Sequence, residues 1–147
     1  MASTRIRRVI AAPRERVFGA LLEPAWRVPA GMTSEVHEWD AREGGGLRVS
    51  LTYEEADREG KTEGRTDTYR GRFVRIVPGR LLVEVDEFES ADPALRGEMT
   101  MTIELADADG GGTELVALHD GLPPGLSPAA NEAGWSESLA RLAALVE

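Results

Sequence analysis

The amino-acid sequence predicts an α+β fold in which a curved antiparallel β-sheet of about six to seven strands wraps around one long C-terminal helix, with short helices after the first strand. Two observations predict this arrangement. Between residues 33 and 121, polar and apolar residues alternate in short segments separated by turns, which is typical of antiparallel strands with one wet and one dry face. The remaining residues change to helical spacing, with apolar side chains on one stripe: Trp135, Leu139, Leu142 and Val146.

Length and composition bound the class of protein. The chain has 147 residues, enough to bury a core of its own, and we expect a single domain over residues 1–147. The absence of cysteine excludes disulfides and thiolate chemistry. The net charge of −9 argues against binding to nucleic acid or anionic lipid, because phosphate groups require concentrated positive charge. No secretory signal or membrane-spanning apolar stretch is recognisable, so we expect a cytoplasmic protein.

The N-terminal part predicts one strand followed by short helices. Arg5–Ile10 is a β-branched run and predicts the first strand. Residues 11–24 predict a helix, because Pro13 suits a first helical position and apolar residues recur at helical spacing: Val17, Phe18, Leu21 and Leu22. Residues 25–32 are interpreted as a second short helical turn or a loop, since Pro29 and Gly31 interrupt them.

Six further strands are predicted, at residues 33–42, 47–55, 65–77, 81–89, 97–105 and 113–121. Their alternation assigns the following residues to the inner face: Leu47, Val49, Leu51, Tyr53, Tyr69, Gly71, Phe73, Val83, Val85, Met99, Met101, Ile103 and Leu105. By the same parity, four carboxylates are expected to face solvent: Glu84, Asp86, Glu98 and Glu104. Gly71 is expected at a bend or a close backbone approach.

The C-terminal helix is expected to cover the inner face of the sheet. Ser127 is a suitable N-cap and Pro128 a suitable first residue. A helix of about 20 residues is roughly 30 Å long, which is enough to cross several strands. Gly134 interrupts its pattern and marks either a close backbone approach beside Trp135, which we favour, or a kink.

Several stretches in this order resemble one family. They are "IAAPRERVFGALLEP", "HEWDAREGGGLRV", "GRFVRIVPGRLLVEV", "GGTELVALHDGLP" and "GWSESLARLAALVE". The chain resembles, over nearly its whole length, the START/Bet v 1-like (SRPBCC) superfamily, in the branch named after the activator of Hsp90 ATPase (AHSA1-like). The resemblance implies the helix-grip fold with a pocket; Asp40 and Arg42, which belong to the matching hairpin motif, are expected to pin that hairpin. The eukaryotic co-chaperone of this branch has an extra N-terminal domain that contacts Hsp90, for which 147 residues leave no room.

A sheet curved around a helix encloses a pocket if its inward side chains leave volume unfilled. The ligand-binding candidates form an apolar wall with a few polar groups: Trp39, Tyr53, Tyr69, Phe73, Met99, Met101, His119 and Trp135. Whether they enclose a pocket or fill the space by packing against one another stays open.

The candidate catalytic residue is His119, which could act as a general base, whereas the face that His37 occupies is not determined by the sequence. No metal-binding spacing is present, and we expect neither a metal nor a cofactor.

Three functions fit these features. The first is binding of a small apolar or amphipathic molecule between the sheet and the C-terminal helix. The second is a cofactor-free enzyme of the cyclase or aromatase kind, with His119 and a tyrosine as acid and base. The third is an interaction module, such as a partner of a chaperone, and a homodimer is also compatible with the sequence. We favour the first.

Overall fold

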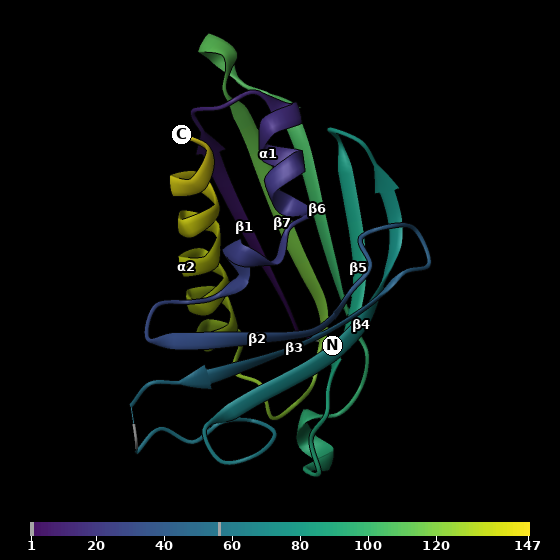
Figure 1. Cartoon of the computed structure of the whole chain (residues 1–147), viewed down its shortest axis with the longest axis vertical. Coiled ribbons are helices and arrows are strands. Elements are labelled where there is room, and N and C mark those ends of the chain that lie inside the picture. Colours follow the sequence, from purple (N-terminus) through teal and green to yellow (C-terminus); the bar gives the residue numbers. More distant parts are fainter. Residues whose placement is uncertain (1, 56) are drawn as a thin grey trace.

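The computed structural model describes residues 2–55 and 57–147, and within these ranges seven strands form one antiparallel sheet in the order β1-β7-β6-β5-β4-β3-β2 (Figure 1). The strands are β1 (Ala2–Ile10), β2 (Met32–Trp39), β3 (Gly46–Tyr53), β4 (Thr66–Val77), β5 (Leu81–Phe88), β6 (Met99–Asp107) and β7 (Thr113–Leu122). The helices are α1 (Arg14–Leu21) and α2 (Pro128–Val146), with short 3₁₀ turns η1 (Pro24–Arg27), η2 (Pro93–Leu95) and η3 (Asp109–Gly111). The predicted α+β fold is confirmed, and the first strand begins earlier than expected.

The sheet is strongly twisted, so that β2 and β3 cross the direction of β1 and β7 and fold over one end of α2 (Figure 1). Gly71 in β4 permits a tight approach between neighbouring strands. A Cβ atom at this position would lie 2.2 Å from Asp86 Oδ1 and 2.3 Å from the carbonyl oxygen of Val85, distances that no real side chain tolerates. The expected close approach at Gly71 is therefore confirmed, and it brings the Asp86 side chain against the backbone of β4.

The helix α2 begins as the sequence predicts. The Ser127 hydroxyl accepts a hydrogen bond from the backbone N–H of Ala130 at 3.2 Å, and Pro128 occupies the first helical position. The predicted stripe divides into two parts. The C-terminal half of α2 packs into the core through Ser138, Leu139, Leu142, Ala143 and Val146. The N-terminal half leaves Asn131, Gly134 and Trp135 only half-buried, because it spans a pocket instead of a packed core.

The main core lies between α1, the C-terminal half of α2 and the inner face of β6 and β7. Among its fully buried members are Val17, Leu21, Ile103, Leu115 and Leu142. Trp26 of η1 is also fully buried, and its Nε1–H donates to the carbonyl oxygen of Leu21 at 3.1 Å. Burying an indole in this way fixes η1 against the core, so the next residue, Arg27, is carried into the interior as well.

The hairpin between β2 and β3 is pinned as expected. Arg42 Nε donates to Asp40 Oδ2 at 2.8 Å, and both side chains are substantially exposed, so solvent screens the pair and it adds little to stability. Gly45 is required for a steric reason, since a Cβ atom there would lie 2.0 Å from the carbonyl oxygen of Asp40. This hairpin is therefore a structural feature and lies away from the pocket.

Candidate functional site

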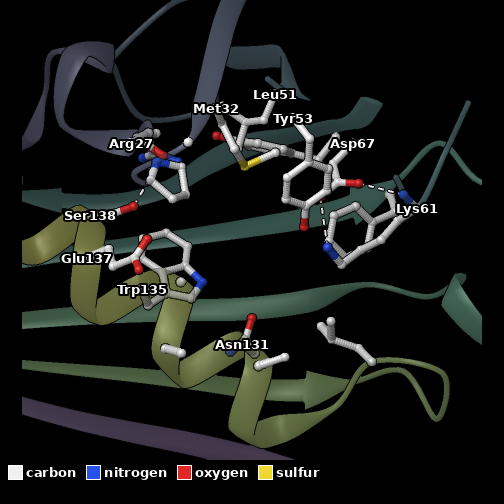
Figure 2. Close-up of a pocket in the computed structure, with 18 of the residues that line it drawn as sticks. Arg27, Met32, Leu51, Tyr53, Lys61, Asp67, Asn131, Trp135, Glu137 and Ser138 are labelled. Atoms are coloured by element: carbon white, nitrogen blue, oxygen red, sulfur yellow. Dashed lines mark hydrogen bonds and ion pairs between the residues drawn. The ribbon is translucent and has the colours of Figure 1, made fainter. Parts of the chain in front are cut away.

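A pocket of ≈ 400 Å³ lies between the N-terminal half of α2, the segment 27–32 and the inner face of the sheet (Figure 2). Six strands contribute to it: Met32 from β2, Leu51 and Tyr53 from β3, Asp67 and Tyr69 from β4, Asp86 and Phe88 from β5, Met99 from β6, and His119 from β7. Trp135 projects from α2 across the pocket toward the sheet (Figure 2). The volume and the largely apolar lining are those of a site for a small organic molecule.

The sequence-predicted ligand-binding residues divide into two groups. Those that line the pocket are Tyr53, Tyr69, Met99, His119 and Trp135. Trp39, Phe73 and Met101 belong to the core instead: Phe73 and Met101 are fully buried, and the Trp39 ring meets the Phe73 ring edge-on at a centroid distance of 5.4 Å. The indole N–H of Trp39 donates to the carbonyl oxygen of Leu22 at 2.8 Å, which holds this ring away from the pocket.

The sequence interpretation of β5 is wrong. Glu84 and Asp86 were expected to face solvent, but their exposed fractions are 0% and 5%. The sheet register explains the orientation: Glu84 pairs with Met101 and Asp86 with Met99, and directly paired residues of antiparallel strands project to the same face. Val83 and Val85, expected inside, are on the opposite face and only half-buried.

Arg27 compensates for the buried charge of Glu84. Its two terminal nitrogens donate to the two carboxylate oxygens of Glu84 at 2.6 and 2.5 Å, which is the bidentate geometry that arginine and carboxylate favour. Its guanidinium also lies 5.0 Å from the ring centre of Trp26 and 4.8 Å from that of Trp39. Burial alone would raise the pKa of Glu84, but the charge and hydrogen bonds of Arg27 lower it below its usual value. The two residues form a closed, mutually neutralised ion pair.

Asp86 lies beside Glu84 as a second buried acid, and it forms no ion pair with a cationic side chain among the described residues. Burial, followed by the negative charge of Glu84 and a hydrogen bond to it, raises the pKa of Asp86 well above its usual value. Two buried carboxyl groups in contact cannot readily both be ionised, so Asp86 carries the shared hydrogen. Its Oδ1 atom is buried and has no hydrogen-bond partner among the described residues.

His119 is held in place by Asn131 of α2. The Asn131 amide nitrogen lies 3.0 Å from His119 Nδ1 and donates to Thr4 Oγ1 at 3.1 Å, so both of its hydrogens are used. The imidazole therefore accepts at Nδ1 and carries its hydrogen on Nε2, which is buried without a partner in the described part of the chain. Burial lowers the pKa of His119 to about 4, so the ring is neutral at pH 7.

The pocket thus has a floor and a rim of different character. Five of the buried or half-buried lining residues are here named the floor: Arg27, Tyr69, Asp86, Met99 and His119. Burial raises the pKa of Tyr69 to about 12, so its phenol is neutral as well. Five of the exposed lining residues are named the rim: Ala30, Glu55, Arg58, Ala133 and Glu137. Because Glu84 behind the floor neutralises the charge of Arg27, the floor is polar without net charge, whereas the rim carries charges of both signs.

A second ion pair closes one end of the pocket. Lys61 Nζ donates to Asp67 Oδ2 at 2.7 Å, and the Tyr53 ring lies beside this pair (Figure 2). The Arg58 guanidinium lies 4.4 Å from the ring centre of Tyr53. These contacts hold Tyr53 at the end of the pocket opposite Arg27 (Figure 2).

Gly134 contributes open space to the pocket, and both sequence interpretations of it are wrong. The helix α2 runs without interruption from Pro128 to Val146, and among the described residues no packing partner lies within 4 Å of a Cβ atom built at Gly134. Asn131 and Ser138, three residues before it and four after, both line the pocket, so position 134 lies on the same helix face. Ala140, by contrast, is exposed and does not line the pocket.

We expect the variant Gly134→Ala to raise the free energy of unfolding by about 0.4–1 kcal/mol, because a glycine in the middle of a helix costs backbone entropy and the added methyl group meets no neighbour. Gly19 in α1 offers a matched control, since it also has no packing partner within 4 Å in the described residues. Urea unfolding of both alanine variants measures the effect. A loss of stability in Gly134→Ala alone would contradict the open space at this position.

His37 lies on the outer face of the sheet, which settles its orientation. It is exposed, and its Nε2 lies 2.8 Å from Ser50 Oγ on β3, whose neighbours Val49 and Leu51 face inward. The two histidines therefore do not meet. Among the described residues no group of three or more His, Asp or Glu side chains is arranged to hold a metal ion.

None of the helices in residues 2–55 and 57–147 is both long and apolar enough to cross a bilayer.

A curved antiparallel sheet with a pocket beneath a C-terminal helix is the helix-grip arrangement of the START/Bet v 1-like superfamily. Within it, the chain belongs to the family of activator of Hsp90 ATPase homolog 1-like proteins, which it matches over residues 11–147. The expected family and fold are thus confirmed. No curated protein matches the chain.

Solved structures of bacterial proteins share this fold. Protein CV1439 from Chromobacterium violaceum is 36% identical, with a TM-score of 0.86 over 99% of this chain and 96% of that one. Protein Mll3558 from Rhizobium loti is 26% identical, with a TM-score of 0.74 over 97% of this chain and 95% of that one. Protein NE0264 from Nitrosomonas europaea, at 23% identity and a TM-score of 0.70, covers 97% and 92% and shows the fold alone.

Sequence reasoning missed Arg27, Asn131 and the role of Asp86. A weak signal was present for the first and the last. Arg27 follows a tryptophan in a short segment bounded by prolines, and two carboxylates alternate with apolar residues in "LLVEVDEF". An arginine beside a buried aromatic residue and acids within an apolar strand are compatible with a buried ion pair. Only the sheet register and the path of η1 bring them together.

Proposed function

We propose that the chain, as one domain over residues 1–147, binds a small amphipathic molecule in the pocket between the sheet and α2. The observation that carries this proposal is the pocket itself: ≈ 400 Å³, with an apolar wall and a polar floor. Pockets of about 300–1,000 Å³ with a few placed polar groups are typical of small-molecule sites. Methionine and tryptophan in the wall favour an apolar ligand body of adaptable shape.

The position of Gly134 supports the same proposal. A glycine here lowers the stability of the helix and leaves open volume where α2 faces the pocket. The C-terminal half of α2, which packs against the core, shows no corresponding glycine. A fold selected only for core packing would be expected to fill this space.

The test uses the dye prodan, an uncharged naphthalene ketone whose emission shifts to the blue in apolar surroundings. We expect saturable binding to the wild-type protein with a blue shift. The variant Gly134→Leu places a side chain in the pocket and is expected to weaken binding by at least about tenfold, equivalent to roughly 1.4 kcal/mol. Fluorescence titration gives the dissociation constant of each protein.

Ala140→Leu is the matched control, because it adds the same side chain to the exposed face of the same helix. We expect it to bind the dye as the wild type does. Equal binding by wild type, Gly134→Leu and Ala140→Leu would contradict the proposal, and so would the absence of any saturable binding. Circular dichroism of both variants verifies that the fold is retained.

A cofactor-free enzyme is the second candidate, and one observation favours it. The pocket floor combines a neutral carboxylic acid, Asp86, with a neutral imidazole, His119, and environments that push the pKa values of neighbouring groups apart are typical of acid–base sites. If the protein is an enzyme of this kind, His119→Phe abolishes turnover while prodan still binds. Turnover that survives in His119→Phe would remove His119 from the mechanism.

A further inference from the structure

The polar floor of the pocket limits the chemistry of the ligand, and this inference rests on the proposed function. We propose that the inner end of the ligand is an uncharged oxygen acceptor, a carbonyl or a hydroxyl group, that receives the Nε2–H hydrogen of His119. Ionised acids and amines are disfavoured at this position. The argument depends on three features of the floor.

The first feature is that His119 presents a donor. Its Nδ1 is occupied by the Asn131 amide at 3.0 Å, and the second hydrogen of that amide is given to Thr4 Oγ1 at 3.1 Å. The hydrogen of the neutral imidazole is thereby assigned to Nε2. Nε2 has no partner in the described part of the chain, although His119 is only 7% exposed and lines the pocket. A buried N–H without an acceptor costs free energy, and a ligand oxygen would recover it.

The second feature is that the charges of the floor are already paired. Arg27 is held by Glu84 through two hydrogen bonds, and its guanidinium also lies against the rings of Trp26 and Trp39. The charge of its guanidinium is therefore already neutralised by Glu84, and only its Nε–H, which is buried without a partner among the described residues, is left for a ligand. A ligand anion would enter beside Glu84 without a free cation, and ionised groups are expensive to bury unless they are paired.

The third feature disfavours amines. A ligand ammonium group offers only donors, and at His119 it would meet the Nε2–H donor. Asp86 carries the hydrogen shared with Glu84, so it supplies no free negative charge for a cation. An uncharged oxygen accepts the Nε2–H hydrogen of His119 without either penalty.

The experiment compares three naphthalene probes that differ only in one substituent: acetylnaphthalene, isopropenylnaphthalene and naphthoate, all substituted at the same ring position. The first two have the same shape, but only the ketone can accept a hydrogen bond. Each probe competes with bound prodan. We expect the wild-type protein to bind the ketone roughly three- to tenfold tighter than the hydrocarbon, as one hydrogen bond provides, and to bind naphthoate more weakly than the ketone.

The variant His119→Phe keeps an aromatic ring but removes the donor. We expect its preference for ketone over hydrocarbon to fall to about one, with hydrocarbon affinity nearly unchanged. Met99→Leu is the matched control on the same floor, because it changes shape without touching a donor, and should keep the preference. A preference that persists in His119→Phe, equal affinity of ketone and hydrocarbon in the wild type, or tightest binding of naphthoate would each overturn the inference.

A second measurement reads the imidazole directly. In protein labelled with ¹⁵N-histidine, the His119 signals should show a hydrogen on Nε2 and none on Nδ1, and the ketone should shift Nε2 more than Nδ1. His37→Gln assigns the two histidines. A free protein with the hydrogen on Nδ1 would overturn the inference. Prodan that binds while the ketone shows no preference refutes this inference alone, whereas prodan that does not bind refutes the proposed function.

Discussion

Glu84→Gln is expected to lower the free energy of unfolding by about 3–5 kcal/mol, because it removes the carboxylate and leaves the buried Arg27 charge without its partner. Glutamine preserves the volume of the side chain, so the loss reports on charge and not on a cavity. Urea unfolding at pH 7, with the midpoint and slope of the transition, measures the difference from the wild type.

Asp86→Asn is the control for this prediction. Because burial beside Glu84 already keeps Asp86 as a neutral acid, the neutral amide should cost much less than Glu84→Gln. The paired substitution Arg27→Met with Glu84→Met should be less destabilising than either single change, since it removes both charges together. If Asp86→Asn costs as much as Glu84→Gln, the assignment of charge within this group is incorrect.

The second large effect is a dependence of stability on pH that His119 causes. The pKa of a free histidine is 6.5, and burial lowers that of His119 to about 4. Between these values the unfolded chain binds a proton that the folded protein does not, so stability rises with pH in this window and is lost as pH falls from 6.5 to about 4. A shift of this size corresponds to about 3 kcal/mol between pH 7 and 4.

Urea unfolding of the wild type and His119→Phe at several pH values between 7 and 4 tests this prediction. The carboxylates titrate in both proteins, so the difference between the two curves isolates His119. We expect the wild type to lose about 3 kcal/mol more than the variant over this range. Curves that run parallel would show that His119 is accessible to protons in the folded state.

The sequence predicted the architecture well, because its patterns are local. The alternation in β3 and β6 places Leu47, Val49, Met101 and Ile103 inside, as observed, and the C-terminal part of the α2 stripe packs into the core. The N-terminus of α2 follows from Ser127 and Pro128 alone. These features depend on neighbours a few residues apart, which the sequence displays directly.

The pocket floor could not be predicted in the same way, since it joins residues that are distant in the chain. The rule that carboxylates face solvent failed in β5 because Arg27, 57 positions away from Glu84, neutralises the charge inside. The tautomer of His119 depends on Asn131 in α2 and on Thr4 in β1. The alternation of residues along a strand does not show which of its two faces is buried when a buried side chain elsewhere in the chain neutralises the polar face.

The division of α2 into two halves has a consequence for how such proteins diversify. The last turns of α2 pack into the core, whereas Asn131, Gly134 and Trp135 in its early turns line the pocket, where the Trp135 ring also packs against the rings of Trp26 and His119. Substitutions in those early turns can therefore change which molecules bind in the pocket while the fold keeps its stability. Bacterial proteins that are 36% and 26% identical to this chain share its architecture, and one architecture can carry sites for different molecules.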